Sequence, residues 1–168
     1  MKFYTLYLLS LFLIICGCGF DNERSNSSAD SDYESPAENQ ISDAGEVALE
    51  LESNDEMRYD KSLLRVKAGQ RVTLVLKHTG ELQESLMGHN FVLLKKGTNI
   101  DDFAAEAVAA TGNDYIPESS NAIIAHTEMI GGGEQTSVSF TAPSKGAYDY
   151  ICTFPGHYGL MRGKFIVE

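Results

Sequence analysis

The sequence is short of cysteine, histidine and basic residues. Its three cysteines are Cys16, Cys18 and Cys152, so the chain beyond Cys18 holds a single thiol and cannot form an internal disulfide. Lys and Arg number 13 against 24 Asp and Glu, a formal net charge of −11 that argues against nucleic acid as a partner. With only four histidines, the chain is poorly supplied for a second imidazole-rich metal site.

The N-terminal apolar run, residues 6–15, is too short to cross a bilayer. Lys2 precedes the run and small residues follow it, which predicts a signal peptide over residues 1–17. The segment Ile15-Cys16-Gly17-Cys18 resembles a bacterial lipobox, which implies cleavage before Cys18 and a diacylglyceryl thioether on its sulfur. An ordinary secretory peptide that is cut nearby is the alternative interpretation.

Residues 19–45 lack any apolar period. They hold seven acidic residues against Arg24 alone, a net charge of −6, so this stretch is too polar to bury a core. We therefore expect residues 18–45 to form a lipidated N-terminus and a disordered acidic tether. A flexible coil of this length spans about 28 Å, and like-charge repulsion would lengthen it. The alternative interpretation is a leader segment without a function, which would have the same composition.

Alternation of apolar and polar residues begins at Glu46 and predicts short strands. The only helical pattern lies at residues 101–110, and the glycines at 131–133 form a turn without the context of a phosphate loop. Short strands and no parallel βαβ rhythm predict an all-β, antiparallel β-sandwich with one short helical insertion, over residues 46–168. The expected strands cover residues 47–51, 63–67, 72–77, 134–141, 148–152 and 163–168, and a run after His89.

The segment from Cys152 to Met161 contains three side chains that could bind a metal. A thiol, an imidazole and a thioether recur there at spacings of five and four, in Cys152, His157 and Met161. The Pro155-Gly156 pair keeps the segment a loop, so the three side chains can converge. A soft thiolate with imidazole and a weak thioether suits copper that cycles between Cu(I) and Cu(II).

A second imidazole is available in Met87-Gly88-His89-Asn90. His89 precedes a run of β-formers, so it can be fixed at the end of a strand and face the loop. His89, Cys152 and His157 would then form a trigonal plane around the metal. Met161 would be one axial ligand, and the flexible Gly88 could bring its carbonyl close on the other side. Alone, each residue type is more often structural; the joint spacing favours copper.

These motifs resemble the azurins, a family of blue-copper cupredoxins. The resemblance includes Ala125-His126-Thr127 and Ile130-Gly131 and extends over residues 47–168. It implies a Greek-key sandwich and one type 1 copper, with His89, Cys152 and His157 as strong ligands and Met161 and Gly88 as axial ones. The disulfide common in azurins has no cysteines here.

The resemblance also implies how the site is tuned. The backbone N–H groups of Asn90 and Phe154 would donate to the Cys152 sulfur, and the Asn90 side chain would tie the two ligand-bearing loops together. Such hydrogen bonds lower the charge density on sulfur and raise the reduction potential.

A site with four or five protein donors leaves no open position for a substrate, so we expect an electron-transfer protein and not an enzyme. Its partners would be redox proteins such as c-type cytochromes or a terminal reductase or peroxidase. The domain is expected to be monomeric and anchored by lipid to a bacterial membrane, on its periplasmic or cell-surface side. An apolar collar would surround His157 and dock the partner, and any one of its members could instead be loop packing: Leu82, Leu86, Met87, Phe154, Tyr158, Gly159 and Leu160.

Two alternatives remain open at the level of sequence. A copper carrier or storage lipoprotein would favour an exchangeable site, against which both axial candidates argue. A copper enzyme subunit would need a second site with additional histidines. Only His78 and His126 remain for that, and we expect both to be structural or incidental.

Overall fold

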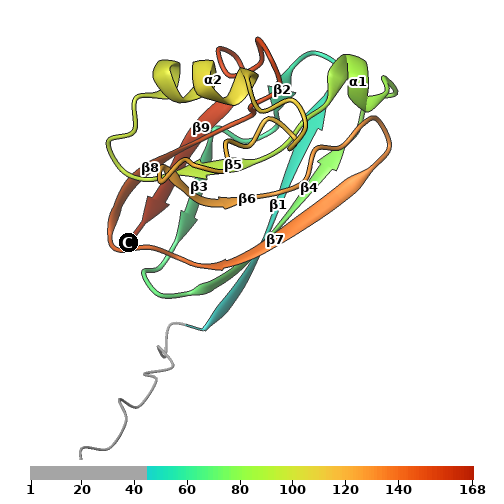
Figure 1. Cartoon of the computed structure of the whole chain (residues 1–168). Coiled ribbons are helices and arrows are strands. Elements are labelled where there is room, and N and C mark those ends of the chain that lie inside the picture. Colours follow the sequence, from blue (N-terminus) through green and yellow to red (C-terminus); the bar gives the residue numbers. More distant parts are fainter. Residues whose placement is uncertain (1–44) are drawn as a thin grey trace, which may run out of the picture. The chain divides into compact units, whose positions relative to one another are not determined.

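The computed structural model describes residues 45–168, and the predicted signal peptide and Cys18 lie outside the described residues. Two sheets form the fold (Figure 1). Among residues 45–168, no helix is long and apolar enough to cross a membrane.

The first sheet has four strands and the second has five. The first runs in the order β2 (Arg58–Tyr59), β1 (Glu46–Asn54), β4 (Arg71–His78) and β7 (Gln135–Thr141). The second runs in the order β3 (Leu63–Val66), β9 (Arg162–Val167), β8 (Gly146–Ile151), β5 (Val92–Leu94) and β6 (Ile123–His126). The predicted β-sandwich is confirmed.

The core lies between the inward faces of the two sheets. In β4, Val72, Leu74 and Leu76 are fully buried, while the residues between them are partly exposed. Successive side chains on a strand point to opposite faces, so this alternation places one apolar row inside. Phe165 of β9 and Phe91, just before β5, pack in the same cluster, and burial of such side chains is the main stabilising contribution to the fold.

The strand pairing is mixed, which corrects the expectation of a wholly antiparallel sandwich. β1 pairs with β4 in parallel, with Glu46 opposite Arg71 and Ser53 opposite His78. β3 also pairs with β9 in parallel. Alternation reports which face of a strand is buried but not the direction of its neighbour, so the sequence could not reveal these two pairs.

Two helices interrupt the strands, where one insertion was expected. The short α1 (Glu84–Met87) was not predicted. The helix expected at residues 101–110 is α2 (Ile100–Val108). Its N-cap is Asn99, whose side chain accepts hydrogen bonds from the backbone N–H groups of Asp101 and Asp102. Phe103 of α2 packs in a second cluster with Val92, Leu94, Ile116 and Ile151. Leu93, between the two β5 residues of this cluster, packs in the core, so the second cluster lies on the opposite face of β5.

Candidate metal centre

Three buried donor residues converge where strands of both sheets end. Cys152 follows β8 directly, and His157 lies five residues further along the same loop. His89 comes from the loop before β5, where it forms an isolated bridge with Ile130 instead of opening the strand as expected. The donor atoms of the three side chains all lie within 4.8 Å of one another.

The separations of these donors fit a metal ion. Cys152 Sγ lies 4.0 Å from His89 Nδ1 and 3.8 Å from His157 Nδ1. A metal that bonds sulfur at about 2.3 Å and nitrogen at about 2.05 Å, with about 120° between the bonds, separates the two atoms by about 3.8 Å. One thiolate and two imidazoles in a trigonal arrangement is the donor set of blue-copper sites. The residues present therefore fit copper.

A backbone contact sets the tautomer of His89. Its Nε2 lies 2.9 Å from the carbonyl oxygen of Asn54, at the end of β1. A carbonyl only accepts, so Nε2 carries the proton and donates it, which leaves the lone pair of Nδ1 directed toward Cys152. Hydrogen bonds of this kind fix the orientation and the basicity of a histidine ligand.

Burial keeps both imidazoles neutral in the metal-free protein. His89 is fully buried and His157 is 3% exposed. Loss of hydration lowers the pKa of each to about 4. The positive charge that His78 would carry adds to the effect on both rings, and that of His157 adds to the effect on His89. A metal ion would meet free lone pairs on both rings at neutral pH.

The thiol of Cys152 is held in its protonated form without metal. Burial raises its pKa to about 12, while hydrogen bonds from the backbone N–H groups of Asn90 and Phe154 act in the opposite direction. These two donors are the ones that the resemblance to azurins implied. Copper binding must displace this proton, and the two N–H groups then stabilise the resulting sulfur anion.

Met161 and Gly88, the two expected axial ligands, both contact Cys152. The Cys152 N–H donates to the Met161 carbonyl at 3.0 Å, which extends the β8–β9 ladder by one pair. Side chains opposite each other on antiparallel strands share a face, so the buried Met161 and Cys152 side chains project to the same side. The carbonyl oxygen of Gly88 is 3.9 Å from Cys152 Sγ.

His78 lies against His89, and the other additional histidine, His126, is not among the clustered donors. The His78 ring stacks on the His89 ring, with centroids 4.4 Å apart and 21° between the planes. Its Nδ1 accepts the Gly80 N–H, and its Nε2 donates to the Met87 carbonyl at 3.0 Å. His126 is exposed on β6, and its Nδ1 lies 3.2 Å from the carbonyl oxygen of Thr127.

The collar residues lie at the surface to differing degrees. Leu82, Leu86 and Leu160 are 40%, 60% and 54% exposed, while Met87 and Phe154 are half-buried. Gly159 is exposed, whereas Tyr158 packs against the second core cluster. Tyr158 therefore contributes to packing as well as to the surface beside His157.

Sequence reasoning missed several contacts of the site. Asn54 and Asp114 did not stand out, and neither did Tyr59, whose hydroxyl donates to the Asn90 carbonyl. An isolated asparagine or tyrosine carries no sequence signal for such a partner, because the contact depends on which loops the fold brings together.

Comparison with known proteins places the chain among copper proteins. Residues 45–168 match the model of the copper binding proteins, plastocyanin/azurin family. Azurin-1 of Alcaligenes xylosoxydans xylosoxydans is 38% identical over 122 residues, which cover 70% of this chain and 95% of that protein. Outer membrane protein H.8 of Neisseria gonorrhoeae is 41% identical over 125 residues, 72% of this chain and 67% of that protein.

A solved structure agrees with these relatives. Auracyanin A, a "blue" copper protein from Chloroflexus aurantiacus, matches with a TM-score of 0.68 and 38% identity, over 73% of this chain and 99% of that one. The match to the family model spans the whole described domain, which also carries the clustered thiol and imidazoles. The chain therefore belongs to the plastocyanin/azurin family of copper-binding proteins.

Proposed function

We propose that this protein is a one-electron carrier of the bacterial cell envelope, with a single type 1 copper held by His89, Cys152 and His157. Met161 and the Gly88 carbonyl would be the additional, weaker donors. The observation that carries the proposal is the buried cluster of one thiol and two imidazoles, all within 4.8 Å, inside a cupredoxin domain.

The enclosure of the site favours electron transfer over catalysis. Cys152, His89 and Met161 are fully buried, and His157 is 3% exposed. A substrate needs an open coordination position, whereas an electron can cross a closed shell. Bound copper supplies the Cu(I)/Cu(II) couple, and the protein holds the ligands in one geometry so that little rearrangement accompanies a change of oxidation state.

The loop contacts supply this rigidity. Asn90 Nδ2 donates to Thr153 Oγ1 at 2.8 Å, and the Thr153 N–H donates to Asn90 Oδ1 at 2.9 Å. These bonds join the segment of His89 to the segment of Cys152. A copper carrier would instead need a shell that opens, and such a double link opposes opening.

Electrons would leave through the surface next to His157. Leu82, Leu86 and Leu160 are exposed, and apolar surface of this kind suits brief docking. Met87 and Tyr158 complete the proposed docking residues. Residues 46–168 hold seventeen acidic and eleven basic side chains, so a neutral or basic redox protein such as a c-type cytochrome is the partner we propose. A terminal reductase or peroxidase is the other class.

We further propose that the domain is tethered to a membrane through lipid on Cys18. The lipobox-like segment supports this, and one relative is named as an outer membrane protein. Mass spectrometry of the mature protein should find an N-terminal Cys18 with a diacylglyceryl group. An unmodified N-terminus would contradict the anchor and leave the copper function untouched.

The absorption spectrum tests the copper site. The domain from Glu46, loaded with copper, should show the intense visible band of a thiolate-to-copper transition, and Cys152→Ser should abolish it. The serine variant should still fold, because a single buried atom changes. A colourless wild-type domain that releases copper readily would favour the carrier alternative.

A further inference from the structure

Two consecutive residues near the metal centre adopt an unusual backbone conformation. Asp114 has φ 50° and Tyr115 has φ 56°, both in the left-handed region. Non-glycine residues are disfavoured there, and such a conformation persists only where the surrounding structure imposes it. The pair lies outside the ligand loops, between α2 and β6.

The Asp114–Tyr115 pair contacts three different segments around the metal centre. The Asp114 carbonyl accepts from Asn90 Nδ2 at 3.2 Å, and its Oδ2 accepts from the Met129 N–H at 3.1 Å. The Tyr115 ring meets the Phe154 ring edge-on, with centroids 5.5 Å apart and an angle of 68°. Each contact reaches a different stretch of chain.

Two of the contacted residues carry the N–H groups that donate to the sulfur. Asn90 and Phe154 supply those backbone donors to Cys152. The Phe154 ring also packs on His157, with centroids 4.6 Å apart. Movement of the pair would therefore be transmitted to both sulfur hydrogen bonds and to one imidazole ligand.

The third contact leads to the Gly88 backbone. A methyl group added at Gly88 would lie 3.0 Å from Met129 Cγ and 3.0 Å from Phe154 Cδ2, so these two side chains flank the Gly88 backbone. Met129 is held by the Asp114 carboxylate and Phe154 by the Tyr115 ring. The Asp114–Tyr115 pair thus holds both residues whose side chains flank the Gly88 backbone.

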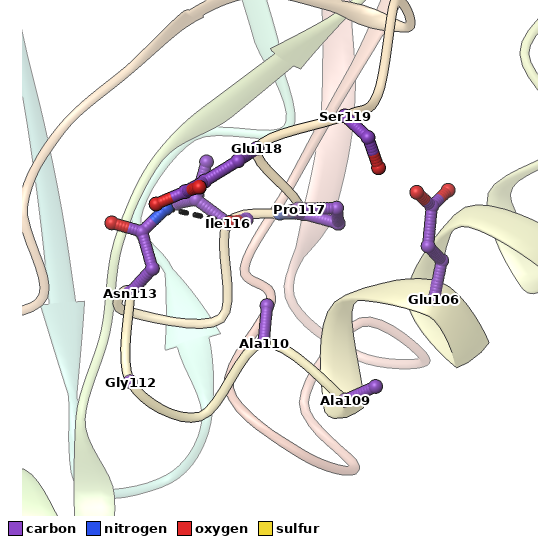
Figure 2. Close-up of a pocket in the computed structure, with 9 residues that line it drawn as sticks. All are labelled: Glu106, Ala109, Ala110, Gly112, Asn113, Ile116, Pro117, Glu118 and Ser119. Carbon is purple, nitrogen blue, oxygen red and sulfur yellow. Dashed lines mark hydrogen bonds between the residues drawn. The ribbon is translucent and has the colours of Figure 1, made fainter.

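The pair is itself anchored on its far side. Asn113 Nδ2 donates to the Ile116 carbonyl at 2.8 Å across the turn, the dashed bond in Figure 2, and the Tyr115 N–H donates to the Ala110 carbonyl at 3.1 Å. Ile116 is buried in the second core cluster. The same turn forms one wall of an open cleft of about 600 Å³ that none of the three metal donors lines.

We propose that Asp114 and Tyr115 are positioning residues that set the reduction potential of the copper by holding the Asn90 and Phe154 N–H groups on the Cys152 sulfur and the Gly88 backbone in place. The inference rests on the copper electron-transfer function. Hydrogen bonds from N–H groups stabilise the electron-rich sulfur and raise the reduction potential of the copper. Substitutions that loosen the Asp114–Tyr115 pair should therefore lower that potential.

Two variants and their conservative counterparts test this in the otherwise unchanged protein. Asp114→Gly removes the carboxylate, and Tyr115→Gly removes the ring; glycine accepts the left-handed backbone in both. Asp114→Asn keeps an oxygen acceptor and tolerates this conformation, and Tyr115→Phe keeps the ring. The measurements are the reduction potential with copper bound and the amide exchange rates of Asn90 and Phe154 in copper-free protein.

In both glycine variants the amide protons of Asn90 and Phe154 should exchange about tenfold faster, which is the effect of losing about one buried contact. Their potential should fall, while Asp114→Asn and Tyr115→Phe stay close to wild type. Wild-type potential and exchange in the glycine variants would overturn the proposal, and so would a lower melting temperature without either change. If Asp114→Gly fails to fold, Tyr115→Gly decides alone. Amide exchange needs no copper, so a protein that bound none would refute the proposed function and still test the positioning.

Discussion

Asn90 and Thr153 hold each other by two hydrogen bonds, each of them the donor in one. Both residues are buried, with Asn90 fully buried and Thr153 3% exposed. Asn90 Nδ2 to Thr153 Oγ1 is 2.8 Å and the Thr153 N–H to Asn90 Oδ1 is 2.9 Å. Asn90 follows His89 and Thr153 follows Cys152, so the pair links the segments that carry two of the proposed ligands.

Asn90→Ala should cost about 2 to 4 kcal/mol of the unfolding free energy, because it leaves two polar groups of Thr153 buried without these partners. Denaturant unfolding of the copper-free protein measures this. The matched control is Thr73→Ala, which removes a hydrogen bond of 2.9 Å to Ser139 on the solvent-facing side of the first sheet. The control should change stability by less than about 0.5 kcal/mol. Similar losses in the two variants would contradict the importance of the link.

The stability of the copper-free protein should peak between about pH 6.5 and pH 9. Burial lowers the pKa of His89 and His157 from 6.5 to about 4, so the unfolded chain binds more protons between these values and stability falls as the pH drops through them. Burial raises the pKa of Cys152 from 9.0 to about 12, so stability falls again as the pH rises above 9.

On the acid side of this maximum, which we call the acid limb, the free energy of unfolding should fall by up to about 3 kcal/mol for each histidine. Melting temperatures from pH 4 to pH 11 measure both limbs. In a His89→Phe variant, one histidine contribution is gone and the acid limb should become shallower. An acid limb unchanged by that substitution would show that other groups govern it.

The sequence predicts which strand residues face the core better than it predicts which strands pair with each other. Val72, Leu74 and Leu76 alternate with polar residues, which fixes β4 and its buried face. Nothing local reveals that β4 lies parallel to β1, because that choice follows from packing of the whole chain. The run after His89 reads as a long strand, yet β5 covers only Val92–Leu94.

The ligand candidates are predictable for a different reason. Cys152, His157 and Met161 lie in one short loop, so their spacing alone restricts where the side chains can meet. The contacts that orient them come from distant segments, such as Asn54 with His89 and Asp114 with Asn90. A carbonyl oxygen is present at every position and gives no sequence signal, so these contacts require the structure.

Gly88→Ala should destabilise the domain by about 1 to 3 kcal/mol and alter the visible spectrum. The added methyl group would lie 2.7 Å from the Glu84 carbonyl oxygen, a backbone atom that can move only with α1. Gly159→Ala is the matched control, because a methyl group there has no neighbour within 4 Å. Chemical unfolding and absorption spectra of both variants provide the test. A spectrum and stability like those of wild type would mean that the backbone at Gly88 is free to adjust.

Met87→Lys should slow electron exchange, because a charge in the collar must lose water when two surfaces meet. We expect a reduction of about three- to tenfold in the second-order rate, either with a natural partner or between two copies of the protein. Copper should stay bound, since Met87 is not a proposed ligand, and its contact with His78 is made by the backbone carbonyl.

The matched control for Met87→Lys is Thr141→Lys, which adds the same charge at an exposed position. Thr141 pairs with Arg71 at the start of β4, whereas His78, which stacks on His89, lies at the other end of that strand. Arg71 and His78 are therefore about 23 Å apart along β4. Rates compared at matched ionic strength, with copper content and potential checked, separate a local effect from a change in net charge.

Equal slowing by the two lysines would mean that net charge governs the encounter. Wild-type rates in Met87→Lys would mean that the electron leaves elsewhere and that Met87, at the end of α1, serves only in packing.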